Sequence, residues 1–116
     1  MAFRFEELQV WQKAMFMNEK INELAKTFPK DEIFILTSQL KRAADSVVLN
    51  IAEGSTGQTK PVFKTFLSYS LRSAIEVVSC LFIAKSRGYI QNDNFATLYT
   101  EYEVLVKMIT SLRNSL

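Results

Sequence analysis

The sequence has few of the residues that break helices. Only three glycines and two prolines occur in 116 residues, and they fall at three places: Pro29, the segment 54–61 and Gly88. A β-sandwich or barrel needs a turn signal about every 8–12 residues, and a phosphate-binding loop needs clustered glycines. The sequence therefore argues against these folds and divides into four long segments.

Histidine is absent, and cysteine occurs once, at Cys80. These absences remove the parts of a Ser-His-Asp triad, a Cys-His dyad and a metal centre built on histidine or cysteine. Cys80 cannot form an internal disulfide and has no basic neighbour on an adjacent turn, so we expect an unreactive thiol. We therefore expect a protein that is not an enzyme and that takes no cofactor, metal or small-molecule substrate.

The sequence also lacks the long apolar runs of secreted and membrane proteins. Glu6 and Glu7 come before any apolar run develops, and the run 77–84 stops at Lys85, well short of the ~18 residues of a membrane span. Fourteen Lys and Arg against twelve Asp and Glu give a net charge of +2. We expect a cytoplasmic protein without a membrane partner, and net charge alone does not indicate nucleic acid.

In each of the four segments, apolar residues recur at alternating steps of three and four, which is the spacing of a helix with one buried face. The predicted helices cover 5–27, 30–53, 60–87 and 92–115. Pro29 and Pro61 suit helix starts, and Gly54 and Gly88 suit the left-handed position that follows a helix. Similar lengths and short connections predict an all-α, antiparallel, up-down-up-down four-helix bundle forming a single domain, 1–116.

The first and third predicted helices carry more apolar surface than one core needs. The extra residues beside their buried stripes are Leu8, Trp11, Met15, Leu71, Ile75, Val78 and Phe82. A large exposed apolar patch on a soluble chain usually marks an interface, so the pattern favours self-association through these residues. The alternative is that the third helix is the central one and that Trp11 covers an end of the bundle.

Polar residues at helical spacing line the other face of the 30–53 helix. This polar motif, together with one carboxylate of the next helix, consists of Arg42, Ser46, Asn50, Glu53, Gly54 and Glu76. In a functional interpretation, cations bind nucleic-acid phosphates; the candidates are Lys41, Arg42, Lys60, Lys64 and Arg72. In a structural interpretation, which we favour, Arg42 pairs with Glu76 or Glu53 across a helix or subunit interface, while the Ser46 and Asn50 side chains satisfy backbone groups.

Two other sets of residues invite functional interpretations. Glu53 and Glu76 have no nucleophile or metal partner, so the sequence does not favour acid–base chemistry. Tyrosines can stack on bases, and the chain has Tyr69, Tyr89, Tyr99 and Tyr102. For Tyr99 and Tyr102 the spacing instead favours the edge of the core, with the hydroxyl groups in water.

The polar motif is part of a longer signature. Its residues are Phe28-Pro29, Glu32, 36–39, 42–44, Ser46 and Asn50-Ile51-Ala52-Glu53-Gly54, with further matches at Phe5, Leu8, 10–11, Phe63, 66–67, Ser73, Glu76 and 88–90. This signature resembles that of the 23S ribosomal RNA intervening-sequence protein family, the four helix bundle protein family of bacteria. The most specific part is 50–54. Arg72 stands where the family usually has glycine.

The resemblance implies an antiparallel four-helix bundle that assembles into a homopentameric ring. Some family members are encoded inside insertions in ribosomal RNA genes, and many have no established function. The family is also similar to the accessory variability protein of diversity-generating retroelements, a basic pentameric barrel that binds nucleic acid and a reverse transcriptase. Two interpretations follow: a homo-oligomer that binds RNA, DNA or a nucleic-acid enzyme, or a structural or protein-binding oligomer without a nucleic-acid role.

Overall fold

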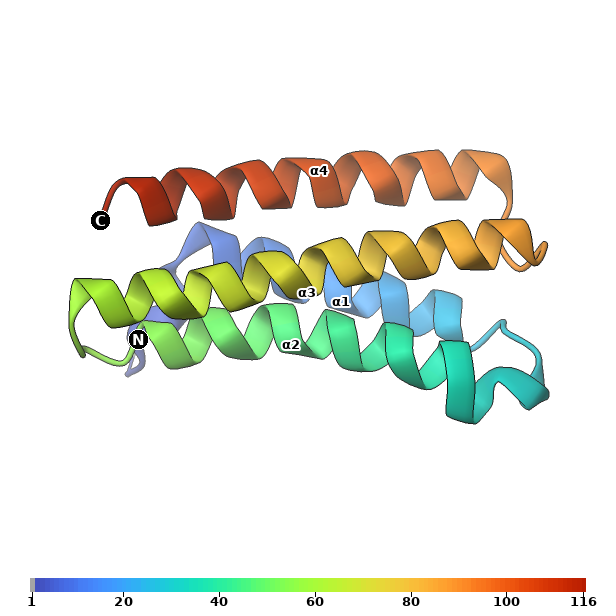
Figure 1. Cartoon of the computed structure of the whole chain (residues 1–116), viewed down its shortest axis with the longest axis horizontal. Helices are drawn as coiled ribbons and strands as arrows, with labels where there is room; N and C mark the ends of the chain where they lie inside the picture. The colour runs from blue at the N-terminus through green and yellow to red at the C-terminus, as the bar shows by residue number, and fades with distance from the viewer. Residues whose placement is uncertain (1) are drawn as a thin grey trace.

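The computed structural model describes residues 2–116, which form four long antiparallel helices (Figure 1). The helices are α1 (Gln9–Ala25), α2 (Ser38–Gly54), α3 (Lys60–Ser86) and α4 (Asn92–Asn114). No strand occurs within the described range. The all-α four-helix architecture expected from the spacing of apolar residues is confirmed.

The first helix is shorter at both ends than the predicted 5–27. The chain starts with a 3₁₀ turn, η1 (Arg4–Glu7), and α1 begins only after Leu8, whose backbone is extended (φ −80°, ψ 125°). At the other end, Thr27 N–H donates to the Leu24 carbonyl at 2.9 Å. This bond and the one from Phe28 N–H to the Ala25 carbonyl span three residues, so the chain tightens directly before Pro29. A proline disfavours helical backbone angles at the residue that precedes it.

The entry to α2 differs from the continuous helix predicted from residue 30. A 3₁₀ turn, η2 (Lys30–Glu32), leads into a π-helical segment, η3 (Ile33–Thr37). A π turn takes one more residue per turn than an α turn, so residues before it are rotated relative to the buried stripe of α2. Ile33, which the spacing assigns to that stripe, is therefore exposed, as is its neighbour Phe34.

Gly54 and Gly88 serve different purposes, and the expectation for Gly54 is wrong. Gly54 is the last residue of α2, and positive φ angles occur instead at Gly57 (87°) and Gly88 (77°). A Cβ atom on Gly54 would lie 2.7 Å from Phe66 Cβ and 2.9 Å from Phe63 Cδ1. Glycine is needed at 54 because α2 and α3 approach closely there, not because the backbone turns.

The ends of α3 follow from local sequence. Val62 N–H donates to Thr59 Oγ1 at 3.3 Å, and a proline follows in the first turn. At the C-terminal end, Gly88 is left-handed as predicted, and Tyr89 N–H donates to the Ala84 carbonyl at 2.8 Å. This is the Schellman arrangement, which satisfies carbonyls left free at the end of a helix.

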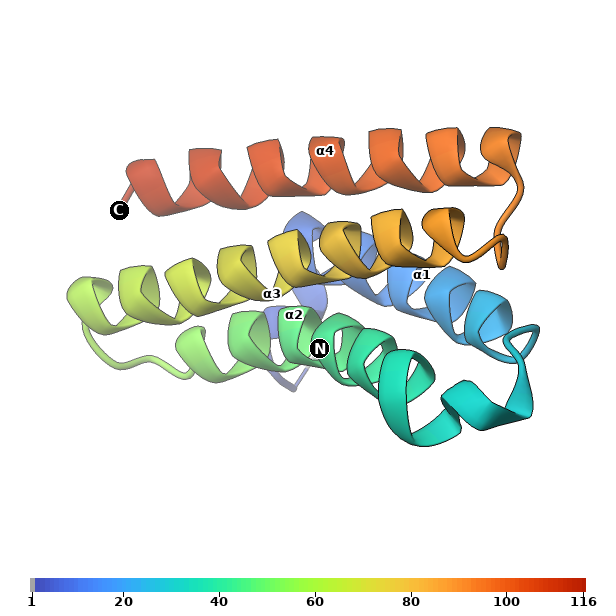
Figure 2. The same ribbon diagram turned by 45° about the vertical axis from the view of Figure 1, so that its right-hand side comes forward.

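Helix α3 lies between α2 and α4 in both views (Figures 1 and 2). By length and composition alone, it could cross a membrane. The central helix of a bundle meets the same test, because it must be apolar over a wide sector. Its inward side chains, including Leu67, Val77 and Leu81, are fully buried.

Of the seven apolar residues singled out as extra surface, only Ile75 and Phe82 are largely exposed, at 63% and 51%. Leu71 is buried, and four others are half-buried against the core: Leu8, Trp11, Met15 and Val78. The Trp11 ring lies 4.8 Å from the ring of Phe5 in η1. The extra apolar surface of the first helix is thus largely covered within the chain, and the exposed part lies on α3.

Candidate functional site

A polar groove of about 620 Å³ lies between α2 and α3. Its polar side chains are Ser38, Gln39, Arg42, Ser46, Ser73 and Glu76, and Phe34 and Ile35 also line it. The structure thereby brings together three members of the predicted polar motif, Arg42, Ser46 and Glu76. We call this hollow the polar groove.

Serine hydroxyl groups join the two helices along this groove. Ser73 Oγ donates to Ser46 Oγ at 2.8 Å, and Asn50 Nδ2 donates to the Ser46 carbonyl at 2.9 Å. Deeper in the core, Ser70 Oγ donates to the Val47 carbonyl at 2.8 Å. Ser46 and Asn50 therefore have partners within the chain: Ser46 is bonded to α3 through Ser73, and Asn50 bonds back to Ser46 within α2.

Arg42 does not form the ion pair that the structural interpretation expects within one chain. Within residues 2–116, ion pairs join Lys13 to Glu101 and Arg87 to Glu32, and none involves Arg42. The Glu76 carboxylate instead accepts a hydrogen bond from Gln39 Nε2 at 3.2 Å. The expected pairing of Arg42 with Glu76 or Glu53 is thus not made within one chain, because the amide one turn earlier on α2 faces Glu76.

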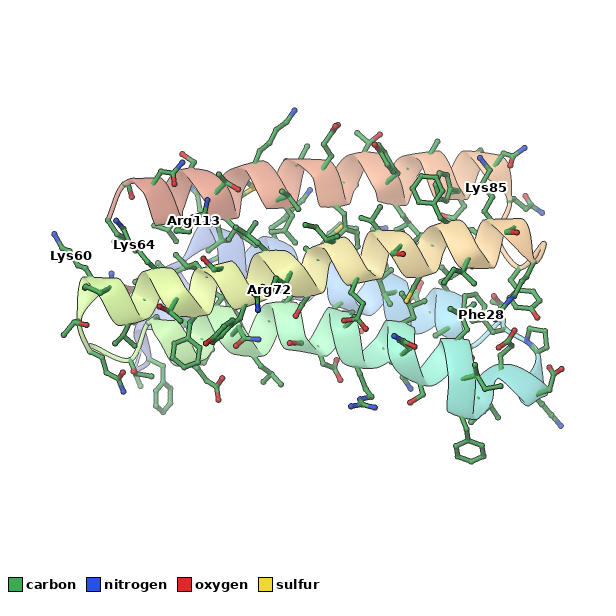
Figure 3. The ribbon with its side chains drawn as sticks, viewed as in Figure 1. Phe28, Lys60, Lys64, Arg72, Lys85 and Arg113 are labelled. Atoms are coloured by element: carbon green, nitrogen blue, oxygen red, sulfur yellow. The ribbon has the colours of Figure 1, made fainter. Side chains whose placement is uncertain are left out.

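A second cluster of charge lies along the first half of α3. Lys60, Lys64 and Arg72 project from this helix, and Arg113 Nη1 reaches across from α4 to donate to Ser68 Oγ at 3.4 Å (Figure 3). We call these four cations the basic stripe. Helix α3 carries no Asp or Glu before Glu76, and its N-terminal end adds the positive pole of the helix dipole. No carboxylate on this half of α3 therefore offsets the positive charge of the basic stripe.

An exposed aromatic ring lies at the end of the basic stripe. The Arg72 guanidinium carbon is 6.0 Å from the centre of the Tyr69 ring, and Phe66 packs edge-on against that ring at 5.8 Å. Exposed aromatic rings beside arginine are surfaces on which nucleic-acid bases stack. Tyr69 was one of four tyrosines considered from sequence, whereas Arg113 was missed because only the packing of α4 on α3 brings it near.

The structure does not gather the five predicted phosphate ligands into one surface. Lys41 faces α1, where it lines a small hollow with Asn18 and Asp45, and Arg42 lies in the polar groove. Lys60, Lys64 and Arg72 lie along the first half of α3, where Lys60 and Arg72 are twelve residues apart, roughly 18 Å along the axis at ~1.5 Å per residue.

An apolar groove of about 350 Å³ lies between α3 and α4. It is lined by Ile75, Val78, Ser79 and Phe82 of α3 and by Tyr99, Tyr102, Glu103 and Val106 of α4. The Phe82 ring packs edge-on against Phe95 at 4.9 Å and against Tyr99 at 6.1 Å. We call this hollow the apolar groove.

The two tyrosines of the apolar groove differ in burial. Tyr99 is partly exposed, as the sequence predicts, but the expectation of an edge position for Tyr102 is wrong because that residue is only 1% exposed. Burial raises the pKa of the Tyr102 hydroxyl. Tyr102 therefore belongs to the core beneath the groove rather than to the surface.

Three polar side chains form a cluster at the end of the bundle that holds the α3–α4 turn. The buried Glu32 of η2 accepts hydrogen bonds at Oε2 from the Tyr89 hydroxyl at 2.7 Å and from Arg87 Nη1 at 2.9 Å. The Tyr89 hydrogen bond and the Arg87 charge together outweigh burial, and they hold the pKa of Glu32 below its usual value. The hydrogen bond to Glu32 raises the pKa of Tyr89. We call these residues the Glu32 cluster.

Replacing Tyr89 by phenylalanine should lower the free energy of unfolding, and the loss relative to wild type should be larger at pH 7 than at acid pH. Because the pKa of Glu32 is lowered on folding, its contribution is present above the unfolded value of 4.5 and is lost as pH falls through the folded pKa. Tyr89→Phe removes the hydrogen bond that is the main cause of the lowered pKa of Glu32. Denaturant unfolding at pH 7 and pH 3 measures the loss of stability, with Tyr99→Phe as the control. Equal losses of stability at both pH values would contradict the role given to the Tyr89–Glu32 hydrogen bond.

The remaining reactive side chain is Cys80, which is buried. Burial, with a smaller effect from the negative charge of Glu76, raises the pKa of its thiol. A raised pKa lowers the fraction of nucleophilic thiolate. Among residues 2–116, no group of three His, Cys, Asp or Glu side chains is placed to hold a metal ion.

The family model of the 23S rRNA-intervening sequence protein matches residues 6–111. The chain belongs to this family. The match runs from η1 to the last turns of α4, and it includes the polar groove, the apolar groove and every residue of the basic stripe except Arg113. Family membership thus agrees with the resemblance found in the sequence.

The fold is also similar to that of a solved relative. The crystal structure of a protein of unknown function from the S23 ribosomal protein family of Bacteroides thetaiotaomicron VPI-5482 matches with a TM-score of 0.83 and 22% sequence identity. The match covers 90% of this chain and 95% of that one. No curated protein matches the chain.

Proposed function

We propose that this family member is a non-enzymatic homo-oligomer that binds nucleic acid through the basic stripe. The observation that carries the proposal is the grouping of Lys60, Lys64 and Arg72 on a half of α3 that has no carboxylate, with Arg113 reaching Ser68 of that half from α4. Lysine and arginine contacts to phosphates supply most sequence-independent affinity. The Tyr69 ring beside Arg72 offers a stacking surface for an unpaired base.

Self-association forms the second part of the proposal. Phe34, Ile75 and Phe82 are large apolar residues that remain exposed on a single chain, and exposed apolar surface usually marks an interface. The family resemblance implies a homopentameric ring. Repeating the basic stripe on each copy would strengthen binding to a long nucleic acid, because further contacts within one complex are intramolecular. We place the protein in the cytoplasm, where a single thiol stays reduced.

The triple variant K60E/K64E/R72E should lose salt-dependent binding to single-stranded RNA or DNA. The three residues are exposed, so the fold should survive. Each neutralised phosphate on a single strand contributes about −0.7 to the slope of log K against log salt. Removing three contacts should therefore reduce the slope by roughly two units per bound protomer. Filter binding over a range of salt concentrations measures this.

The matched control is K26E/K30E/K85E, which makes the same charge change with three exposed lysines away from the basic stripe (Figure 3 shows Lys85 at the other end of α3). It should keep most of the wild-type slope. An equal loss in both triple variants would mean that total charge, and not the stripe, governs binding. Wild-type protein that binds no nucleic acid at low salt would remove the nucleic-acid part of the proposal.

The second candidate function is a structural or protein-binding oligomer without a nucleic-acid role. The apolar groove favours it, because apolar hollows with exposed aromatic walls are common anchoring sites in protein interfaces. The same filter-binding assay separates the two candidates. If the protein forms a stable oligomer but retains no nucleic acid on the filter at any salt concentration, the result supports this second function.

A further inference from the structure

The most exposed large apolar side chain of the described chain belongs to Phe34, at 93%. Its neighbours Ile33 and Ile35 are also exposed, so three consecutive apolar residues face solvent at the entry to α2. They lie on η3, whose π-helical backbone continues directly into α2. The phenyl ring is thus presented on a helical support rather than on a flexible loop.

The apolar groove is a matching recess elsewhere on the molecule. Ile75 and Phe82 are exposed on its α3 side, Tyr99 is partly exposed on its α4 side, and the buried Tyr102 lies beneath. Protein interfaces concentrate their binding energy where an aromatic side chain fills such an apolar recess. The recess of about 350 Å³ has room for one aromatic side chain.

Phe34 cannot fill the groove of its own chain. With Ile35 it borders the polar groove on the α2 side of α3, whereas the apolar groove lies on the α4 side. Helix α3 separates these sides in both ribbon views (Figures 1 and 2). A second copy of the chain, however, can present its Phe34 to this groove.

We infer that Phe34 of one copy occupies the apolar groove of the next copy, an inference that rests on the self-association proposed above. Charge supports this occupant. Arg42, which shares the polar groove with Phe34, makes no ion pair within residues 2–116, and over the same range neither does Glu103, which lines the apolar groove. The contact would therefore bring an unpaired cation towards an unpaired carboxylate at the edge of an aromatic centre, which is the usual anatomy of an interface.

The contact uses different surfaces of the two copies. Each copy supplies one Phe34 and one groove, so the association is head to tail, and it closes into a ring when the rotation between neighbours permits. A two-fold contact, in contrast, would place the same surface on both sides. This difference gives the inference a specific test with two complementary variants.

The test uses Phe34→Asp and Ile75→Asp, both at exposed positions where the fold should tolerate a carboxylate. Sedimentation gives the mass, and circular dichroism checks the helix content. Each variant alone should sediment as a 13.3-kDa monomer. An equimolar mixture should form a 1:1 heterodimer and nothing larger, because one intact Phe34 then meets one intact groove. Phe16→Asp, at a 55% exposed phenylalanine of α1, should assemble like wild type.

Each other outcome has a defined meaning. A mixture that stays monomeric, an Ile75→Asp variant that assembles normally, or equal dissociation by Phe16→Asp overturns the pairing of Phe34 with the groove. If wild type assembles in these cases, the proposed self-association stands and only the pairing fails. Wild-type protein that is itself monomeric refutes the proposed self-association, and the pairing fails with it.

Discussion

Replacing Tyr102 by alanine should lower the free energy of unfolding by about 3–5 kcal/mol, the range for loss of a large buried aromatic side chain. Tyr102 is among the largest fully buried side chains, at 1% exposed, and it packs beneath the apolar groove between α3 and α4. Truncation would leave a cavity that the long helices can close only in part. Denaturant unfolding at pH 7 measures the loss.

The matched control is Tyr102→Phe, which keeps the ring and removes only the hydroxyl group. It should be close to wild type at pH 7. Because burial raises the pKa of Tyr102 in the folded state, its contribution is present below the unfolded value of 10 and is lost as pH rises through the folded pKa. The phenylalanine variant should therefore lose less stability than wild type above pH 10. A Tyr102→Ala loss below about 1 kcal/mol, under the usual range for a buried aromatic, would contradict the buried position.

Replacing Gly54 by alanine should destabilise the bundle by about 1–3 kcal/mol, the usual cost of overpacking. In an exposed helix the same change stabilises by about 1 kcal/mol, because alanine is the better helix former. Here the added Cβ would meet Phe66 Cβ at 2.7 Å and Phe63 Cδ1 at 2.9 Å. The close approach therefore reverses the sign. Thermal or denaturant unfolding of the two proteins measures it.

A second variant separates backbone proximity from crowding by aromatic rings. Phe63→Ala removes the ring atoms that would lie 2.9 and 3.4 Å from a Cβ on Gly54, but it leaves Phe66 Cβ at 2.7 Å, so it should not rescue Gly54→Ala. A double-mutant cycle of these two changes should show no relief of the clash. A Gly54→Ala protein at least as stable as wild type would show that α2 and α3 can separate at this point without cost.

The features that the sequence predicts correctly depend on neighbours within a turn or two. Thr59 and Pro61 at the start of α3, and Gly88 at its end, lie where the sequence predicts them. Capping and turn formation involve residues three to five positions apart, so local sequence contains the necessary information. The periodic apolar residues likewise predicted four helices, because they recur at the helical period.

The errors lie where packing between elements selects among local options. Ile33 fits an α-helical stripe by spacing, yet η3 forms a π turn that turns it outward. Gly54 suits a helix terminus by sequence, but its requirement comes from Phe63 and Phe66 on another helix. Tyr102 has helical spacing to the buried residues Leu98 and Leu105, but we expected it at the edge of the core with its hydroxyl group in water, and the position of α4 against α3 buries it.

The same division applies to the candidate sites. The sequence by itself places Lys60, Lys64 and Arg72 on one helix, because a rise of ~1.5 Å and a rotation of ~100° per residue set their positions. Only the tertiary structure brings Arg113 to Ser68, joins Glu32 to Tyr89 and, within residues 2–116, leaves Arg42 without an ion pair. Contacts between helices depend on how the helices cross and which faces meet, and the spacing within one helix does not contain that information.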